Sequence, residues 1–115
     1  MHPYKRAVRV NDLLREEIAL IVMRRIKDPR VGFLTITGVE VTEDLKIARV
    51  FISVLDRAHR EETLSVLNAA SGFIRSELSK KVKMKFIPQL EFHIDSSIDY
   101  GDRIDTLLRK IKEEK

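Results

Sequence analysis

Apolar residues recur at helical spacing in three segments of the chain. The first segment presents one apolar face, which is made by Leu14, Ile18, Ile21 and Val22. We expect its helix to be capped by Asn11, whose side chain can accept a hydrogen bond from the first turn, and to end near Ile26. Pro29 then stops the helix, because the residue before a proline avoids helical geometry.

The second helical segment runs from about residue 61 to residue 82, and its apolar stripe consists of Leu64, Leu67, Ala70, Ile74 and Leu78. A third helix is predicted from about Asp102 onward, with the apolar residues Ile104, Leu107, Leu108 and Ile111. Residues 112–115 follow it as a tail that we expect to be frayed.

Three other segments alternate between apolar and polar residues, as half-buried strands do. The first runs from Phe33 to Val41, and its parity changes at Gly38, which predicts a β-bulge. The second runs from Lys46 to Leu55, and the third covers residues 89–95. Since only a short turn joins the first two strands, they should form an antiparallel hairpin.

The order of these elements predicts an α+β fold. Helices connect the second strand to the third, so these strands should be parallel neighbours in a three-stranded mixed sheet with the helices on one face. The opposite face would be partly open and would carry Arg49, Phe51, Ser53, Glu91 and His93. No linker or repeat divides the sequence, so we expect a single domain over residues 1–115.

Gly72 lies inside the second helical segment, in Ala70-Ser71-Gly72. Glycine in a helix interior costs about 1 kcal/mol relative to alanine. We therefore predict that the helix bends here and divides into a pair, and that Gly72→Ala would disturb the angle between the halves. The bend could shape a binding surface, or it could only wrap the chain around the core.

Composition narrows the function classes. The 115 residues include 22 Lys and Arg against 18 Asp and Glu, a formal net charge of +4, which permits nucleic-acid binding without requiring it. The absence of cysteine excludes disulfides, thiolate zinc sites and cysteine nucleophiles. The sequence shows no secretory signal and no apolar run of membrane-spanning length, so we expect a cytoplasmic protein without a membrane partner.

Basic residues gather in two clusters. The first surrounds the end of the first helix and comprises Arg24, Arg25, Lys27 and Arg30. The second follows the predicted bend and comprises Arg75, Lys80, Lys81, Lys83 and Lys85. On a binding surface these side chains would contact phosphates and supply affinity without sequence choice. Alternatively, cations near helix C-termini only stabilise the helix macrodipole.

Candidate catalytic residues are few. An acidic stretch could hold Mg²⁺, although its residues equally suit helix caps and loops: Asp95, Asp99, Asp102 and Asp105. No glycine-rich phosphate loop is present. The phenylalanines fit core positions, although Phe51 on the open face could stack on a base. We predict a non-enzymatic protein without metal, cofactor or small-molecule substrate.

Several separated segments carry a family resemblance. They are Lys27-Asp28-Pro29-Arg30-Val31-Gly32-Phe33, residues 35–39, residues 42–50, residues 88–97 and Gly101-Asp102-Arg103-Ile104. In this order they resemble the bacterial ribosome-binding factor A family over nearly the whole chain. The resemblance implies a type II KH-like fold whose helix pair is joined at an Ala-x-Gly kink, here Ala70-Ser71-Gly72, without the Gly-x-x-Gly loop of other KH domains.

The resemblance also implies an assembly factor, not a nuclease, with a link to growth in the cold. Such a factor binds the free 30S ribosomal subunit and assists its late maturation and 16S rRNA processing. We expect a monomer that contacts 16S rRNA, with ribosomal proteins as further candidates for the contact. The expected RNA-binding residues are Arg75, Lys80, Lys81, Lys83 and Lys85, followed by Arg24, Arg25 and Arg30. The alternative is a KH-like protein–protein interaction module that uses the open sheet face.

Overall fold

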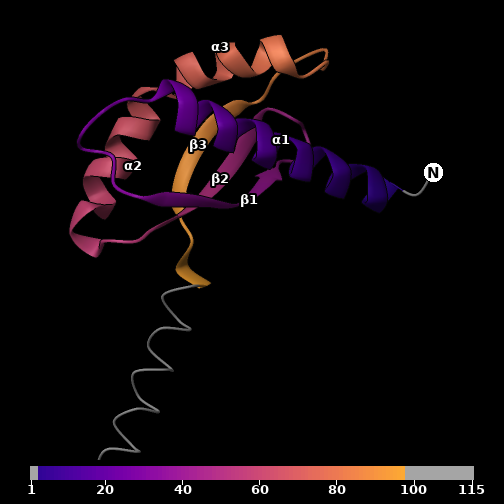
Figure 1. Cartoon of the computed structure of the whole chain (residues 1–115). Coiled ribbons are helices and arrows are strands. Elements are labelled where there is room, and N and C mark those ends of the chain that lie inside the picture. The colour runs from indigo at the N-terminus through magenta and orange to yellow at the C-terminus, as the bar shows by residue number, and fades with distance from the viewer. Residues whose placement is uncertain (1–2, 98–115) are drawn as a thin grey trace, which may run out of the picture.

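The computed structural model describes residues 3–97. Its elements, in chain order, are α1 (Pro3–Arg25), β1 (Leu34–Val41), β2 (Ile47–Val54), the short 3-10 helix η1 (Arg57–His59), α2 (Arg60–Ala69), α3 (Ser71–Lys81) and β3 (Gln89–Ile94) (Figure 1). The helix predicted from Asp102 and the tail at 112–115 lie outside the described residues.

The three strands form one sheet in the order β1-β2-β3. β1 and β2 are antiparallel, whereas β2 and β3 are parallel neighbours connected through α2 and α3. This confirms the predicted mixed sheet. The predicted β-bulge is confirmed as well, because the register between β1 and β2 shifts between Ile36 and Gly38.

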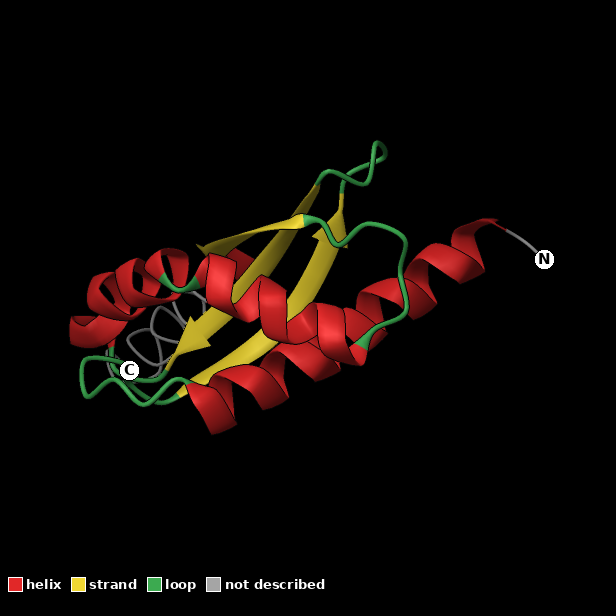
Figure 2. Cartoon of the chain, turned by 90° about the horizontal axis from the view of Figure 1, so that it is seen from above, coloured by secondary structure: helices red, strands yellow, loops and turns green. Residues whose placement is uncertain are grey.

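The hydrophobic core lies between the sheet and the helices, which cover one face of it (Figure 2). β2 buries Ala48, Val50, Ile52 and Val54, which alternate with residues on the other face. The helices contribute Leu14, Ile18, Leu67, Ile74 and Leu78, all fully buried. Since burial of one such side chain contributes roughly 1.5–3 kcal/mol, the apolar faces read from the sequence are what holds the helices on the sheet.

α1 begins at Pro3, well before Asn11. The prediction that Asn11 caps this helix is therefore wrong, and Asn11 lies in the helix interior. Proline is favoured in the first turn, where its missing N–H would have no partner within the helix. Residues 4–10 contain neither proline nor glycine, so nothing in them interrupts the helix.

The second helical segment is interrupted at Ala70 rather than at Gly72. Ala70 separates α2 from α3 with φ −89° and ψ 3°. Gly72 lies in the first turn of α3, without a positive φ, and a Cβ added there would meet nothing within 4 Å. The break therefore falls within the predicted Ala70-Ser71-Gly72 kink, at its first residue, and the geometry at position 72 does not require glycine.

Asn68, near the end of α2, fixes this helix against the sheet. Its Oδ1 accepts a hydrogen bond from the Phe92 N–H at 2.9 Å, and its Nδ2 donates to the Phe92 carbonyl oxygen at 3.3 Å. β3 is an edge strand of the sheet, and its outward backbone groups would otherwise need water or another partner. The Asn68 amide therefore provides hydrogen-bond partners for the outward N–H and carbonyl oxygen of Phe92, and it holds α2 against β3.

Candidate nucleic-acid interface

Helices α1 and α3 lie side by side (Figures 1 and 2). Between them is a groove of about 410 Å³, lined by Glu17, Leu20, Ile21, Arg24, Arg25, Glu77 and Lys81. We call it the α1–α3 groove. It brings Arg24 and Arg25 of the first basic cluster together with Lys81 of the second, although the two clusters are far apart in the sequence.

Glu77 lies among the cations of this groove. Its side chain is 15% exposed, and its Oε1 lies 3.8 Å from Arg25 Nη2 and 3.4 Å from Lys80 Nζ. The Arg25 guanidinium also lies over the ring of Phe73, 5.8 Å from its centroid. Arg25 therefore links α1 to α3 through both charge and ring contacts, which fixes its position at the interface of the two helices.

Arg75 has a structural role that the sequence did not suggest. Its Nε and Nη2 both donate to the carbonyl oxygen of Ile87, at 3.0 and 2.7 Å. A charged donor makes a stronger hydrogen bond than a neutral one. The guanidinium thus fastens α3 to the segment that leads into β3.

Lys83 and Lys85 lie in that segment, after the end of α3. Both side chains are exposed, while the flanking Val82, Ile87 and Pro88 are buried. Together with Lys80 and Lys81 they extend the basic surface from the last turn of α3 toward β3. Four of the five residues predicted from the second cluster are therefore exposed lysines in one continuous stretch.

Arg30 does not line the α1–α3 groove. It forms a bidentate pair with Asp28, in which Nε and Nη2 donate to the two carboxylate oxygens at 3.0 and 2.7 Å. The side-chain and backbone hydrogen bonds from Arg30 lower the pKa of Asp28 to about 2. The Gly32 N–H, two residues further on, donates to Thr63 Oγ1 of α2 at 3.1 Å. The turn that carries Arg30 is therefore held against α2 and not beside the α1–α3 groove.

The aromatic side chains are more exposed than the sequence predicted. Phe92 is buried, but Phe33 is 85% exposed, Phe86 is 74% exposed and Phe73 is 42% exposed. The prediction that the phenylalanines mostly occupy the core is wrong for these three. Phe33 lies just before the first residue of β1, although the sequence placed it in the strand. Phe86 lies in the segment between α3 and β3, where no periodic pattern assigns a side chain to a face.

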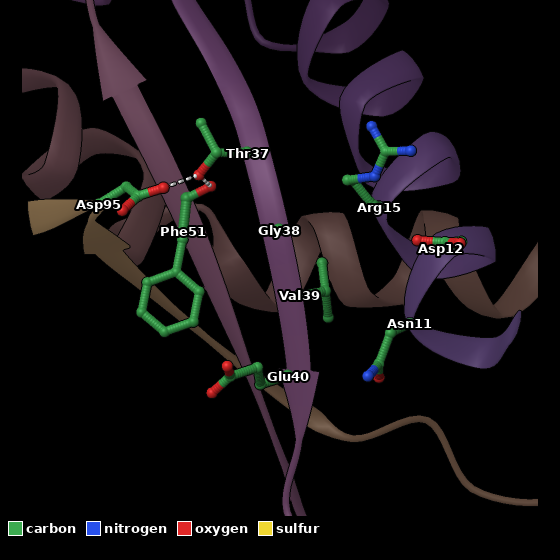
Figure 3. A pocket seen from close by; sticks show the side chains of 9 residues that line it. All are labelled: Asn11, Asp12, Arg15, Thr37, Gly38, Val39, Glu40, Phe51 and Asp95. Carbon is green, nitrogen blue, oxygen red and sulfur yellow. Dashed lines mark hydrogen bonds between the residues drawn. The ribbon is translucent and has the colours of Figure 1, made fainter. Parts of the chain in front are cut away.

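A second groove, of about 470 Å³, lies between α1 and β1 and passes over the bulge at Gly38 (Figure 3). Its charged lining is mainly acidic and consists of Asp12, Glu40, Asp95 and Arg15. Thr37 Oγ1 donates to Asp95 Oδ2 at 2.7 Å and lies 3.2 Å from the Phe51 carbonyl oxygen. Hydrogen bonds from the hydroxyls of Ser97 and Thr37 lower the pKa of Asp95. An acidic groove repels phosphate, so it is a poor nucleic-acid site.

Among residues 3–97, no group of three or more His, Asp or Glu side chains is arranged to hold a metal ion. Of the acidic stretch considered from the sequence, Asp95 is engaged by Thr37 and Ser97, and Asp99, Asp102 and Asp105 lie outside the described residues. Within the same part of the chain, no helix is both long and apolar enough to span a membrane.

A sequence profile described as ribosome-binding factor A matches residues 6–108. A ribosome-binding factor A from Thermodesulfovibrio yellowstonii is 56% identical over 112 residues, which cover 97% of this chain and 95% of that protein.

A crystal structure and a fitted homology model show the same fold at lower identity. The crystal structure of ribosome-binding factor A from Thermus thermophilus matches with a TM-score of 0.70 and 24% identity, over 76% of this chain and 94% of that one. A homology model of the Thermus thermophilus factor, fitted into the cryo-EM map of a 30S–RbfA complex, matches with a TM-score of 0.64 and 24% identity, over 75% of this chain and 91% of that one. The profile and the close relative together show that the chain belongs to the ribosome-binding factor A family.

Proposed function

We propose that this protein binds the free 30S ribosomal subunit and assists its late maturation and 16S rRNA processing without catalysing a reaction. Family membership supports this function, since a member has been fitted into the map of a 30S complex. The proposed contact surface rests on one observation: the α1–α3 groove brings residues of the two basic clusters together. The protein would act as a cofactor-free monomer in the cytoplasm, where ribosomal subunits assemble.

The proposed contact is between basic side chains and rRNA phosphates. Lys80, Lys81, Lys83 and Lys85 form the first part of it, and Arg24 and Arg25 the second. Arg75 contributes by holding the segment that carries Lys83 and Lys85. Contacts of this kind position a protein on RNA and supply affinity without reading sequence.

The mechanism follows from the rigidity of this surface. α1 and α3 are packed through fully buried Ile18, Ile74 and Leu78, so the spacing of the cations is fixed by the core. A rigid cationic surface binds one rRNA conformation more tightly than others. The difference in binding free energy then shifts the folding equilibrium of the rRNA toward that conformation.

Charge reversal tests this surface. Lys80, Lys81 and Lys83 are replaced together by glutamate. We expect this triple variant to bind immature 30S subunits at least tenfold more weakly in co-sedimentation, while its circular dichroism spectrum stays unchanged.

Two single variants form a matched pair. Lys81→Glu and Arg49→Glu change the net charge equally, at exposed residues on opposite faces of the sheet. Only Lys81→Glu should weaken binding. Normal co-sedimentation of the triple variant would overturn the assignment.

Binding to naked rRNA separates this proposal from a protein-binding module on the open sheet face. That face carries Phe51 and His93, whose rings lie 6.1 Å apart. Direct RNA contact predicts binding to naked precursor 16S rRNA that falls steeply with added salt. Subunit binding that persists without any affinity for naked rRNA would instead favour a ribosomal protein as the partner.

A further inference from the structure

The segment between α3 and β3, residues 82–88, is held in place at several points; we call it the lysine loop. Val82, Ile87 and Pro88 are buried. The Val82 N–H donates to the Leu78 carbonyl oxygen at 2.9 Å, and Arg75 holds the Ile87 carbonyl oxygen from the side. With both ends anchored, the loop has a defined shape before any partner binds.

In this anchored loop, the ring of Phe86 and the side chains of Lys83 and Lys85 are exposed to solvent. Phe86 is 74% exposed, and Lys83 and Lys85 in the same loop are exposed as well. The Lys85 Nζ lies 5.8 Å from the centroid of the Phe86 ring. Residues 82–88 contain no acidic residue, and Lys80 and Lys81 immediately precede them. The exposed phenylalanine thus lies within a cationic surface.

We propose that Phe86 stacks on an unpaired base of the bound RNA while Lys83 and Lys85 contact the phosphates next to that base. This inference rests on the proposed function and adds a ligand to it, a single-stranded nucleotide rather than a duplex surface. Every base presents a flat π-face, so an exposed ring among cations suits any single strand. A preformed loop also limits the conformational entropy lost on binding.

The charge of the loop favours RNA over an apolar protein partner. A protein–protein contact centre is depleted of lysine and buries several apolar side chains together. Here the one exposed ring has the Lys85 ammonium 5.8 Å from its centroid, and the neighbouring apolar residues Val82 and Ile87 are already buried in the core. A base with its flanking phosphates matches both the ring and the cations.

Replacing the ring tests the stacking contact. With a short oligoadenylate as the probe, we expect Phe86→Ala to weaken binding about tenfold or more and Phe86→Tyr to retain it. Phe33→Ala is the matched control. Phe33 is more exposed than Phe86, yet it lies at the opposite end of the sheet, where its carbonyl oxygen accepts from Leu55 N–H just beyond the end of β2. Its loss should leave oligoadenylate binding unchanged.

A tryptophan reporter gives a second readout. The chain contains no tryptophan, so Phe86→Trp places a single indole on the lysine loop and Phe33→Trp places one at the control position. Stacking on a base should quench the fluorescence of the first variant on addition of oligoadenylate, and should leave that of the second unchanged. Phe86 is exposed, so both variants should fold, which circular dichroism checks.

The outcomes distinguish the stacking contact from the proposed function. If wild type binds 30S subunits but Phe86→Ala binds both subunits and oligoadenylate like wild type, base stacking is wrong while subunit binding stands. If Phe86→Ala loses subunit affinity, Phe86→Leu keeps it and no variant binds naked RNA, residue 86 makes an apolar contact with a protein and base stacking is wrong. Failure of wild type to bind the subunit at all would overturn the proposed function itself.

Discussion

At the scale of single residues, three arginines that look alike in the sequence have different roles. Arg75 is fastened to the Ile87 carbonyl oxygen, Arg30 is paired with Asp28, and Arg25 bridges α1 and α3 through Glu77 and Phe73. A guanidinium offers five donors in a rigid fork, and the local geometry decides which acceptors they meet. Arginine count alone is therefore a poor guide to the RNA-binding surface.

Gly72→Ala should stabilise the protein, contrary to the expectation from the sequence. Gly72 lies in α3 without a positive φ, and a Cβ there meets nothing within 4 Å. Alanine lowers the conformational entropy of the unfolded chain and favours the helix, so we expect about 0.5–1 kcal/mol more stability in urea denaturation. The break at Ala70 should persist in amide chemical shifts. A less stable variant with a changed helix angle would contradict this.

At the scale of elements, side-chain hydrogen bonds fix how strands and helices meet. Asn68 joins α2 to the outer edge of β3, and Thr37 in the β1 bulge reaches Asp95 just beyond the end of β3. The Asp95 N–H also donates to the Ile52 carbonyl oxygen of β2 at 2.8 Å. Asp95 therefore ties all three strands together at one end of the sheet.

Asp95→Ala should destabilise the fold in a pH-dependent way. The hydroxyls of Ser97 and Thr37 lower the pKa of the folded carboxyl below its ordinary value of 3.8. The stabilisation is therefore complete above that value and is lost as pH falls through the lower pKa of the folded state. We expect a loss of about 1 kcal/mol near neutral pH that shrinks below about pH 4, measured by urea denaturation. A pH-independent difference would show that the carboxylate charge is irrelevant.

Glu77→Gln should strengthen RNA binding. Glu77 is the acidic group between Arg25 and Lys80, and removing its charge makes the α1–α3 groove more positive. We expect about a twofold to fivefold gain in affinity for single-stranded RNA at low salt, with less gain at high salt because of screening. Glu91→Gln on the opposite sheet face is the control and should have no effect. Weaker binding by Glu77→Gln would mean that Glu77 positions the cations.

At the scale of the whole molecule, the modest net charge of +4 is unevenly arranged. Cations gather on α1, α3 and the lysine loop, whereas the groove over the bulge is lined by Asp12, Glu40 and Asp95. The acidic groove lies between α1 and β1, and the cations lie along α1, α3 and the lysine loop, so this uneven charge would orient the molecule toward a polyanion. The side that meets rRNA in the proposed complex is therefore the helical side.

The salt dependence of RNA binding should report this arrangement. Replacing both Lys83 and Lys85 by methionine should reduce the slope of log K against log salt by roughly 1.4, since each phosphate contact to a single strand contributes about 0.7. Arg49→Met, on the open sheet face, should leave the slope unchanged. The measurement is an RNA titration between about 50 and 200 mM salt. Coinciding slopes for wild type and the double variant would remove both lysines from the interface.

Much of the fold was predictable from the sequence because its signals are local. Alternation predicted the three strands, and the parity change at Gly38 predicted the bulge. Helical periodicity predicted which faces of α1, α2 and α3 are buried. The start of α1 was missed, since Pro3 carries a weaker local signal than Asn11. The helix break, predicted within Ala70-Ser71-Gly72, falls at Ala70.

The sequence by itself determined the kinds of elements, their order and the family, because periodicity and motif order are properties of the chain. Tertiary packing alone decided which cations share a surface and which are tied to structural partners. Contacts such as Arg75 with Ile87 and Arg25 with Glu77 join residues that only the packed core brings together. The same holds for Phe86, whose exposure follows from burial of its neighbours in the lysine loop.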